Sequence, residues 1–144
     1  MLIKVIAVGK LKDRMMRDRS LEYFKWLTQY AKLEIRELPD SHPEKEGKNI
    51  LKELEKERGF VFVLSEEGQE FTSRQFAAKL GALDRKAVFV IGGPEGLSPE
   101  VKKRADQLWS LSRLTFTHEM ARLFLAEQLF RAQTILHDTG YHND

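Results

Sequence analysis

Short apolar segments alternate with amphipathic ones along this chain, and this alternation restricts the possible folds more than any other feature. The apolar segments are typical of strands and lie at residues 2–8, 33–38, 60–64, 87–91 and 108–111. Helical patterns lie between and after them, at residues 13–30, 50–58, 72–83, from Ser98 onward, and 118–137. Residues 87–91 are apolar without interruption, as in strands that are buried on both faces of a parallel sheet. The pattern predicts one three-layer α/β/α domain, residues 1–144, with a mainly parallel sheet.

The carboxyl ends of the predicted strands are where a ligand is expected, because open parallel sheets bind ligands at that edge. Three predicted loops lie there, at residues 65–71, 92–97 and 112–117. A further polar stretch, residues 40–48, is also predicted to be a loop, and Gly59 is predicted to end the helix at residues 50–58. Functional residues are therefore expected first in the three loops that follow strands.

The absence of cysteine removes several classes of chemistry. The chain has no disulfide, no thiolate metal site and no cysteine nucleophile. Its four histidines lack the spacing of a metal site, and no Gly-x-Ser-x-Gly segment of a serine hydrolase is present. No apolar run approaches the roughly 18 residues that cross a bilayer, and residues 1–9 do not resemble a signal peptide. We therefore expect a cytoplasmic protein with no metal and no membrane partner.

Charge is distributed unevenly along the chain, although the formal net charge is only +2. Residues 1–36 carry a net charge of +5, residues 37–70 a net charge of −5, and the remainder a net charge of +2. The basic N-terminal segment is compatible with a polyanionic partner such as RNA. A solvated helix face explains the same charges and, from charge alone, is favoured.

The segment Val90-Ile-Gly-Gly-Pro-Glu-Gly-Leu97 is the most informative local motif. Three glycines directly after a buried strand allow the backbone to approach a ligand closely. The segment is neither a phosphate-binding P-loop nor a Gly-x-Gly-x-x-Gly dinucleotide motif. A tight turn from strand to helix, with no ligand, is an equally good interpretation of this motif by itself.

Segment 110–116, Ser-Leu-Ser-Arg-Leu-Thr-Phe, offers hydroxyls for a polar ligand and apolar side chains for an aromatic ring. Ordinary alternation in an edge strand is the simpler alternative. In the last helix, Glu127 and Arg131 are four residues apart and share a face, as surface ion pairs commonly do. Near the C-terminus, Tyr141 and His142 form a pair that is able to stack on a nucleobase and bond to it, although terminal tails are usually frayed.

Taken in order, these segments resemble the RlmH family of the SPOUT superfamily. The resemblance runs from end to end and rests on residues 1–10, 89–97, 110–118, 121–122, 127–132 and 141–142. It implies methylation of N3 of a pseudouridine in 23S ribosomal RNA, with the assembled ribosome as the expected substrate. It also implies a C-terminal trefoil knot, a homodimer with the site at its interface, and S-adenosylmethionine (SAM) as cofactor.

The same resemblance implies roles for individual residues. The cofactor positions that match are Leu64, Gly92, Leu111, Ser112, Arg113, Leu114, Thr115 and Phe116. Substrate-side positions are His118, Arg122 and Tyr141, together with the catalytic candidates Glu127, Arg131 and His142. Arg131 is expected to stabilise the N3 anion, with Glu127 orienting it and His142 handling the proton or recognising the base.

Two positions depart from the family pattern. The family commonly has proline where this chain has Thr117, so a looser start of the last helix is expected. Proline also often precedes the Tyr-His pair, where this chain has Gly140, which predicts a more flexible tail. Two other functions remain as alternatives: an RNA- or ribosome-binding module without catalysis, and a SPOUT methyltransferase that acts on transfer RNA.

Overall fold

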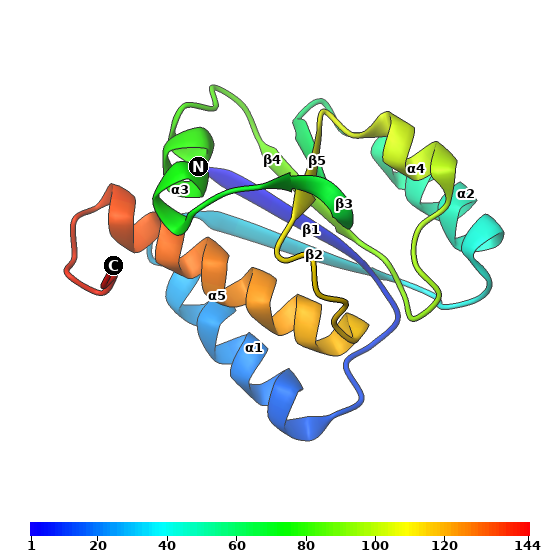
Figure 1. Ribbon diagram of the computed structural model, residues 1–144, viewed down its shortest axis with the longest axis horizontal. Helices are drawn as coiled ribbons and strands as arrows, with labels where there is room; N and C mark the ends of the chain where they lie inside the picture. Colours follow the sequence, from blue (N-terminus) through cyan, green and yellow to red (C-terminus); the bar gives the residue numbers. More distant parts are fainter.

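A computed structural model describes residues 1–144 and contains ten helices and strands (Figure 1). In chain order they are β1 (Leu2–Val8), α1 (Arg14–Leu27), β2 (Lys32–Leu38), α2 (Pro43–Leu54), β3 (Phe60–Glu70), α3 (Ser73–Gly81), β4 (Ala87–Ile91), α4 (Pro99–Arg104), β5 (Gln107–Ser110) and α5 (His118–Leu136). None of the helices combines the length and apolar character needed to span a bilayer.

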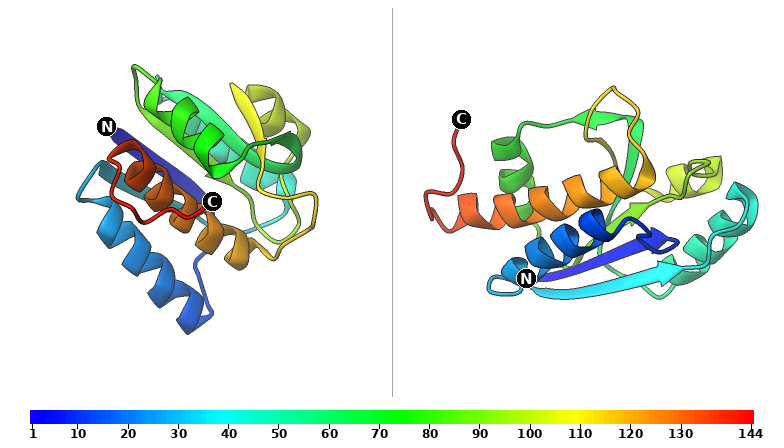
Figure 2. Two further views of the ribbon diagram at one scale, coloured as in Figure 1. Left: turned by 60° about the vertical axis from the view of Figure 1, so that its left-hand side comes forward. Right: turned by 90° about the horizontal axis from the view of Figure 1, so that it is seen from below.

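The five strands form one sheet in the order β2-β1-β4-β3-β5, and all of its pairings are parallel. Helices α1, α3 and α5 pack together on one side of the sheet, and α2 and α4 on the other (Figures 1 and 2). The predicted three-layer α/β/α class with a parallel sheet is therefore confirmed. The trefoil knot stays a prediction.

Two apolar cores, one on each side of the sheet, hold these layers together. Central strand β4 supplies both, because alternate side chains point to opposite faces of a strand: Phe89 faces the α1/α3/α5 side, and Val88 the α2/α4 side. On the first side Phe62 stacks on Phe89 at 4.8 Å between ring centroids, and Phe76 stacks on Trp109 at 4.2 Å. Stacked rings of this kind add to the stabilisation from burial, and they form the rigid base of the region described below.

Helix α2 corrects one prediction. Residues 40–48 are not a loop throughout, because the helix begins at Pro43 rather than at residue 50, and it ends at Leu54, before Gly59. The sequence explains the earlier start: the His42 side chain accepts a hydrogen bond from the Lys45 amide at 3.3 Å, and proline is favoured in a first helical turn. Charged residues in that first turn obscure the helical pattern.

Strand β3 corrects a second prediction. It continues to Glu70 instead of ending at Leu64, so residues 65–71 are mostly strand and not a loop. Its register against β5 shifts between Leu64 and Gln69. Gly68 permits β3 to pass close to β5, because a Cβ atom at this position would lie 2.5 Å from the backbone of Trp109. The shift leaves Glu66 without a partner in β5, next to the predicted ligand loops, whereas Glu70 is paired again with Ser110.

A buried ion cluster joins β1 to the segment around the end of α2. Lys4 is 3% exposed, and its ammonium group lies 2.8 Å from a Glu53 oxygen and 2.7 Å from a Glu57 oxygen. Burial by itself lowers the pKa of Lys4, but the two carboxylate hydrogen bonds outweigh it and the pKa is raised. The hydrogen bond from Lys4 lowers the pKa of Glu53. Burial raises the pKa of Glu57, but the hydrogen bonds from Lys4 and Lys86 outweigh it, so the pKa of Glu57 is also lowered.

This cluster predicts acid sensitivity. A carboxylate whose pKa is lowered by folding stabilises the protein above its unfolded pKa, and that contribution disappears as the pH falls through the folded pKa. The free energy of unfolding should therefore decline below about pH 4.3, the unfolded value for glutamate. Urea unfolding along a descending pH series would measure the decline. In the double variant E53Q/E57Q, the free energy of unfolding should fall less steeply as the pH is lowered. An equally steep fall would contradict the role of this cluster in the acid sensitivity.

Candidate active site

A cavity of about 640 Å³ opens at the carboxyl ends of β3, β4 and β5. It gathers seven of the eight predicted cofactor residues: Leu64, Gly92, Leu111, Ser112, Leu114, Thr115 and Phe116. The segment between β5 and α5, yellow to orange in Figure 2, arches beyond the strand ends and forms one wall. The loop after β4 forms another. The structure thus brings the glycine motif and the residue 111–116 motif to one site.

The loop after β4 is a tight turn at this cavity. The Gly96 amide donates to the Gly93 carbonyl oxygen at 3.1 Å, with Pro94 between them. Gly96 has a φ of 85°, which side chains rarely tolerate. Gly92 is needed for packing, because a Cβ atom there would lie 2.8 Å from Leu97 Cγ. The glycines therefore shape the turn and also leave its backbone open to the cavity.

The opposite wall is fixed to the extension of β3. The Thr115 hydroxyl donates to a Glu66 carboxylate oxygen at 2.6 Å, and Ser112 Oγ accepts from the Leu114 amide at 3.0 Å. Arg113 is the one predicted cofactor residue that does not line the cavity. Its guanidinium contacts the Glu66 carbonyl oxygen and lies 3.1 Å from a Glu70 oxygen. Arg113 is therefore placed to anchor the wall rather than to touch the ligand.

A second cavity, of about 530 Å³, adjoins the first and was not predicted. The two share Leu111 and Phe116 as a common boundary. The lining of the second cavity comes from four parts of the chain, including α1, α3 and α5: Arg19, Tyr23, Phe71, Thr72, Ser73, Phe76, Trp109, Ser110, Leu111, Phe116, Leu123, Phe124, Glu127 and Gln128. Aromatic walls with a few polar groups suit a flat, polar ring. No single sequence segment carries this signal, because the residues converge only in the folded chain.

Arg131 is the centre of a polar cluster at the rim of the second cavity. Its Nε lies 2.9 and 3.2 Å from the two Glu127 carboxylate oxygens, and both side chains are about four-fifths buried. Its Nη1 lies 3.0 Å from His142 Nδ1, and its guanidinium lies 4.9 Å from the centre of the Tyr141 ring. The pair is therefore more than a surface ion pair, and the structure unites all three catalytic candidates.

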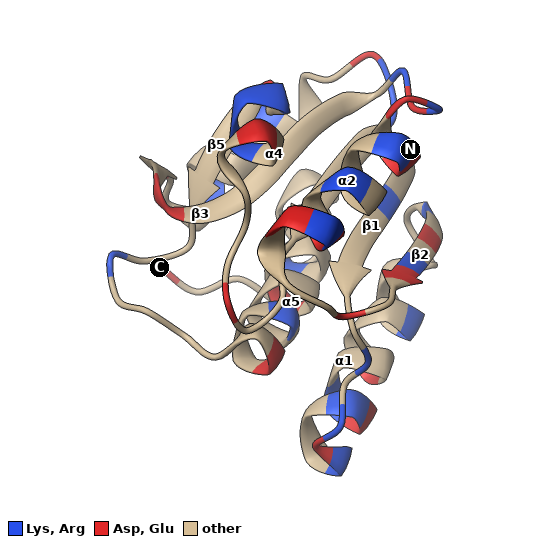
Figure 3. Cartoon of the chain, turned by 90° about the vertical axis from the view of Figure 1, so that its right-hand side faces the viewer, with Lys and Arg blue, Asp and Glu red and all other residues tan.

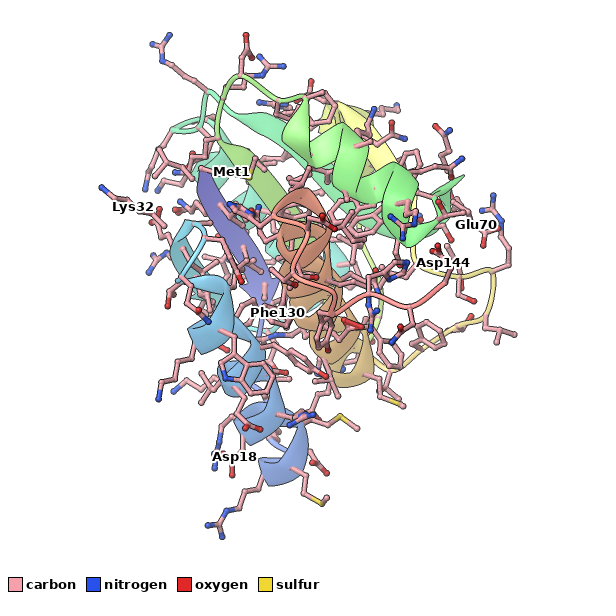
Figure 4. The ribbon with its side chains drawn as sticks, turned by 90° about the vertical axis from the view of Figure 1, so that its left-hand side faces the viewer. Met1, Asp18, Lys32, Glu70, Phe130 and Asp144 are labelled. Carbon is pink, nitrogen blue, oxygen red and sulfur yellow. The ribbon has the colours of Figure 1, made fainter.

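The C-terminal tail is folded against α5 (Figure 2, left). Gly140 has a φ of 82°, so glycine replaces the proline of the family pattern where the backbone reverses. Tyr141 packs on Phe130 at 5.0 Å between ring centroids, and Asp144 pairs with Arg74 of α3 at 2.9 Å. Figure 4 shows the tail crossing α5 toward Asp144. The hydrogen bond from Arg74 lowers the pKa of Asp144. The tail is thus in contact with the rest of the chain at Tyr141 and at Asp144, and the greater flexibility expected from Gly140 stays a prediction.

The His142 ring has a defined hydrogen-bonding state in this cluster. Arginine only donates, so Nδ1 must accept from Arg131. Nε2 lies 2.8 Å from an Asp144 oxygen and therefore carries the ring proton that it donates there. Both ring nitrogens are occupied, which favours a role in holding Arg131 over proton uptake at Nδ1.

His118 and Arg122 differ in their placement. His118 is the first residue of α5 and lines the first cavity. The expected loosening before it is not seen, because the Thr117 side chain caps the helix by accepting from the Met120 amide at 3.2 Å. Arg122 is turned away from both cavities, and its guanidinium bonds to the Gly9 carbonyl oxygen at 3.0 Å and to Glu37 at 2.6 Å. Arg122 thus links α5 to the ends of β1 and β2, and its substrate-side role stays a prediction.

The first cavity fits a SAM-type methyl donor by its chemistry. Ile91, Leu97 and Phe116 provide apolar surface for a purine ring. Glu66 and Glu119 also line it and supply negative charge for a ligand that bears cationic groups. Open backbone groups of the Gly92–Gly96 turn remain for hydrogen bonds to the polar parts of such a ligand.

Comparison with known proteins agrees with this geometry. A family model described as "Predicted SPOUT methyltransferase" matches residues 1–142. Proteins named ribosomal RNA large subunit methyltransferase H are 42% identical in Streptococcus thermophilus, over 99% of both chains, and 37% identical in Porphyromonas gingivalis, over 100% of both. A solved structure from Haemophilus influenzae, described as a probable methylase family protein, has a similar fold with a TM-score of 0.60 at 15% identity; the match covers 99% of this chain and 70% of that one. This chain belongs to the SPOUT methyltransferases and, among them, to the family of ribosomal RNA large subunit methyltransferase H.

Proposed function

We propose that this protein transfers a methyl group from SAM to N3 of a pseudouridine in 23S ribosomal RNA, within the ribosome. One observation carries the proposal: two cavities, one suited to a methyl donor and one to a flat polar ring, meet at Leu111 and Phe116. A cluster around Arg131 adjoins the second cavity through Glu127. The names of the full-length relatives support ribosomal RNA as the substrate.

The cofactor supplies an electrophilic methyl group, and the first cavity supplies its position. Leu64, Gly92 and residues 111–116 would hold it, with Arg113 acting on the wall and not on the ligand. Holding the methyl donor and the acceptor nitrogen in line removes much of the entropic cost of a reaction between two molecules. The shared boundary at Leu111 and Phe116 is where the two reactants would meet.

The acceptor nitrogen must lose a proton to become a good nucleophile. For an imide with a pKa about two units above pH 7, reaching the anion costs about 2.7 kcal/mol. Arg131 would lower this cost by donating hydrogen bonds to the oxygen atoms of the ring, where the negative charge is shared. Glu127 and His142 fix the guanidinium through Nε and Nη1, and Nη2 is left to donate to the substrate.

Recognition of the base falls to the side chains around Arg131. Tyr141 offers a ring for stacking next to the guanidinium, and His118 lies at the first cavity. Burial, together with the neighbouring Tyr23, raises the pKa of the Tyr141 phenol, so it remains a hydrogen-bond donor at neutral pH. The N3 proton leaves to water in this scheme, because both nitrogens of His142 are already bonded.

A homodimer is part of the proposal. Large apolar side chains remain exposed on α1 and α5, the helices that flank the second cavity: Met15 is 81% exposed and Met120 is 37% exposed. Exposed apolar side chains of this size are typical of surfaces that another chain covers. A second copy placed there would close the second cavity and bring its own basic residues to the RNA.

Methylation assays with labelled SAM on ribosomes, free ribosomal RNA and transfer RNA test the proposal, followed by mapping of the labelled nucleotide. Label at N3 of a pseudouridine in large-subunit RNA is the expected result. Label in transfer RNA would favour the alternative SPOUT enzyme. No label, together with no SAM binding by calorimetry, would favour a binding module without catalysis.

The basic segment before α1 gives a prediction about RNA. Lys10, Lys12 and Arg14, the first residue of α1, are exposed beside Asp13, which lines the first cavity, and Figure 3 shows blue bands on the chain that joins β1 to α1. Reversing all three to glutamate should weaken RNA binding and reduce the slope of log K against log salt by about 0.7–0.9 for each phosphate that is no longer neutralised. Filter binding over a salt series measures this. The same three reversals at Lys45, Lys48 and Lys52 of α2 are the control, and an equal effect there would argue against a specific RNA path.

A further inference from the structure

Glu46, in the first turn of α2, is a buried carboxylate that the proposed reaction does not use. It is only 3% exposed. One oxygen, Oε2, accepts a hydrogen bond from the Ser41 amide at 2.6 Å, while the other, Oε1, has no hydrogen-bond partner. Buried polar atoms are nearly always paired, since an unpaired one loses its hydration without replacement. Oε1 is therefore an acceptor that remains available to a donor from a neighbouring segment of the chain.

The carboxylate of Glu46 lies against the turn that forms a wall of the first cavity. A Cβ atom built on Gly93 would lie 3.3 Å from Oε1 and 3.4 Å from Oε2. Gly93 itself lines the cavity. Glu46 thus stands behind the wall, on the side away from the ligand, and the missing side chain of Gly93 is what admits it.

The next residue of α2 contacts the other end of the same turn. A Cβ atom on Gly47 would lie 2.4 Å from Ser98 Oγ, and Ser98 is the N-cap residue of α4. Two consecutive residues of α2 therefore support the segment between β4 and α4 at Gly93 and at Ser98. The position of this segment depends on α2 at both of its ends.

The turn has a donor to offer Glu46. Gly93 and Gly96 pair with each other in an isolated antiparallel bridge, in which the Gly96 amide donates to the Gly93 oxygen at 3.1 Å. The amide of Glu95, which lies between them, donates to no backbone carbonyl. A small displacement of the turn would bring this amide to the free oxygen, and a hydrogen bond to a carboxylate is stronger than one to a neutral acceptor.

We propose that Glu46 is a positioning residue for the methyl-donor site: its free oxygen accepts a backbone N–H of the 92–97 turn when the turn closes on the ligand. Oε2 meanwhile keeps the bond to Ser41, so the turn is tied to the start of α2. The inference rests on the proposed function, because it takes the first cavity to be the SAM site. Glu46 touches neither reactant and acts through the backbone of the turn.

Calorimetry with SAM on the variants E46L and E46Q provides the first test. Losing a hydrogen bond to a charged acceptor should raise the Kd of E46L about 10- to 100-fold. E46Q should lie between E46L and the wild type, because the amide keeps one acceptor oxygen. E44Q is the matched control in the same helical turn, where the side chain is exposed, and its Kd should stay within about twofold of the wild type. Unchanged binding by E46L would overturn the proposal.

Amide NMR provides a readout that lost stability alone would not move. Addition of SAM to the wild type should shift the amide proton of Glu95 downfield, as a new charge-assisted hydrogen bond requires. The shift should be absent in folded E46Q or E46L; its presence there would refute the role of Glu46. If the wild type bound no SAM, the proposed function would fail. If the wild type bound SAM without the amide shift, and E46L bound it equally well, only the role of Glu46 would fail.

Discussion

Replacing Arg131 by alanine is expected to lower the single-turnover rate of methyl transfer about 10²- to 10³-fold, the usual effect of removing one preorganised donor from a developing negative charge. The affinity for SAM should change little, because Arg131 lies outside the cavity assigned to the cofactor. Rapid-quench assays with saturating ribosomes measure the rate, and calorimetry measures the Kd for SAM. A normal rate in this variant would remove Arg131 from the mechanism.

Two further variants separate the charge of Arg131 from its geometry. R131K keeps the positive charge but loses the planar fork that binds Glu127 and His142 together, so it should recover only part of the rate. Raising the pH should partly rescue R131A, because more of the substrate is then ionised without help. A rate of R131A that is low at every pH, with weakened SAM binding, would instead indicate a collapsed site.

Much of the fold followed from the sequence because its periodicity was clear. Uninterrupted apolar residues in β4 predicted a buried parallel strand, and the boundaries of α5 were predicted almost to the residue. The start of α2 and the extension of β3 were missed for a common reason. Both are polar segments whose structure depends on caps and neighbours, such as His42 for α2 and the close passage of Gly68 by β5.

The candidate site was predictable where it depends on position along a strand. Loops that follow parallel strands lie at the same edge of the sheet, which is why Gly92 after β4 and Leu111 after β5 line one cavity, although β3 lies between the two strands. Side-chain direction was not predictable in the same way. Arg113 turns to the Glu70 carboxylate and Arg122 to the Glu37 carboxylate, both far away in the sequence, and no spacing rule reveals those pairings.

Glu46 and the second cavity could not be predicted from patterns in the sequence. A single glutamate in a charged stretch resembles any solvated residue until burial and a missing partner are known. The second cavity likewise needs α1, α3 and α5 to be assembled before Arg19, Phe76 and Glu127 become neighbours. Features of this kind depend on tertiary contacts, which leave no local period in the sequence.

Replacing Lys4 by methionine is expected to reduce the free energy of unfolding by about 3–5 kcal/mol, the usual cost of removing one partner from a buried ion pair. Methionine fills most of the space of the lysine stem, so the loss arises from charge: Glu53 and Glu57 would remain buried without their central cation. Lys86, 3.0 Å from Glu57, compensates only in part. Urea unfolding at neutral pH measures the change.

A second set of variants distinguishes a loss of stability caused by uncompensated charge from one caused by altered packing. In the triple variant K4M/E53Q/E57Q no uncompensated charge is left, so it should be more stable than K4M despite carrying more substitutions. K32M, at the exposed start of β2, serves as the control and should change stability by less than about 0.5 kcal/mol. If K4M were as mild as K32M, or if the triple variant were the least stable, the cluster would not be the electrostatic link between β1 and α2 that its geometry indicates. Because α2 also carries Glu46, SAM binding by K4M should weaken along with stability, whereas K32M should bind normally.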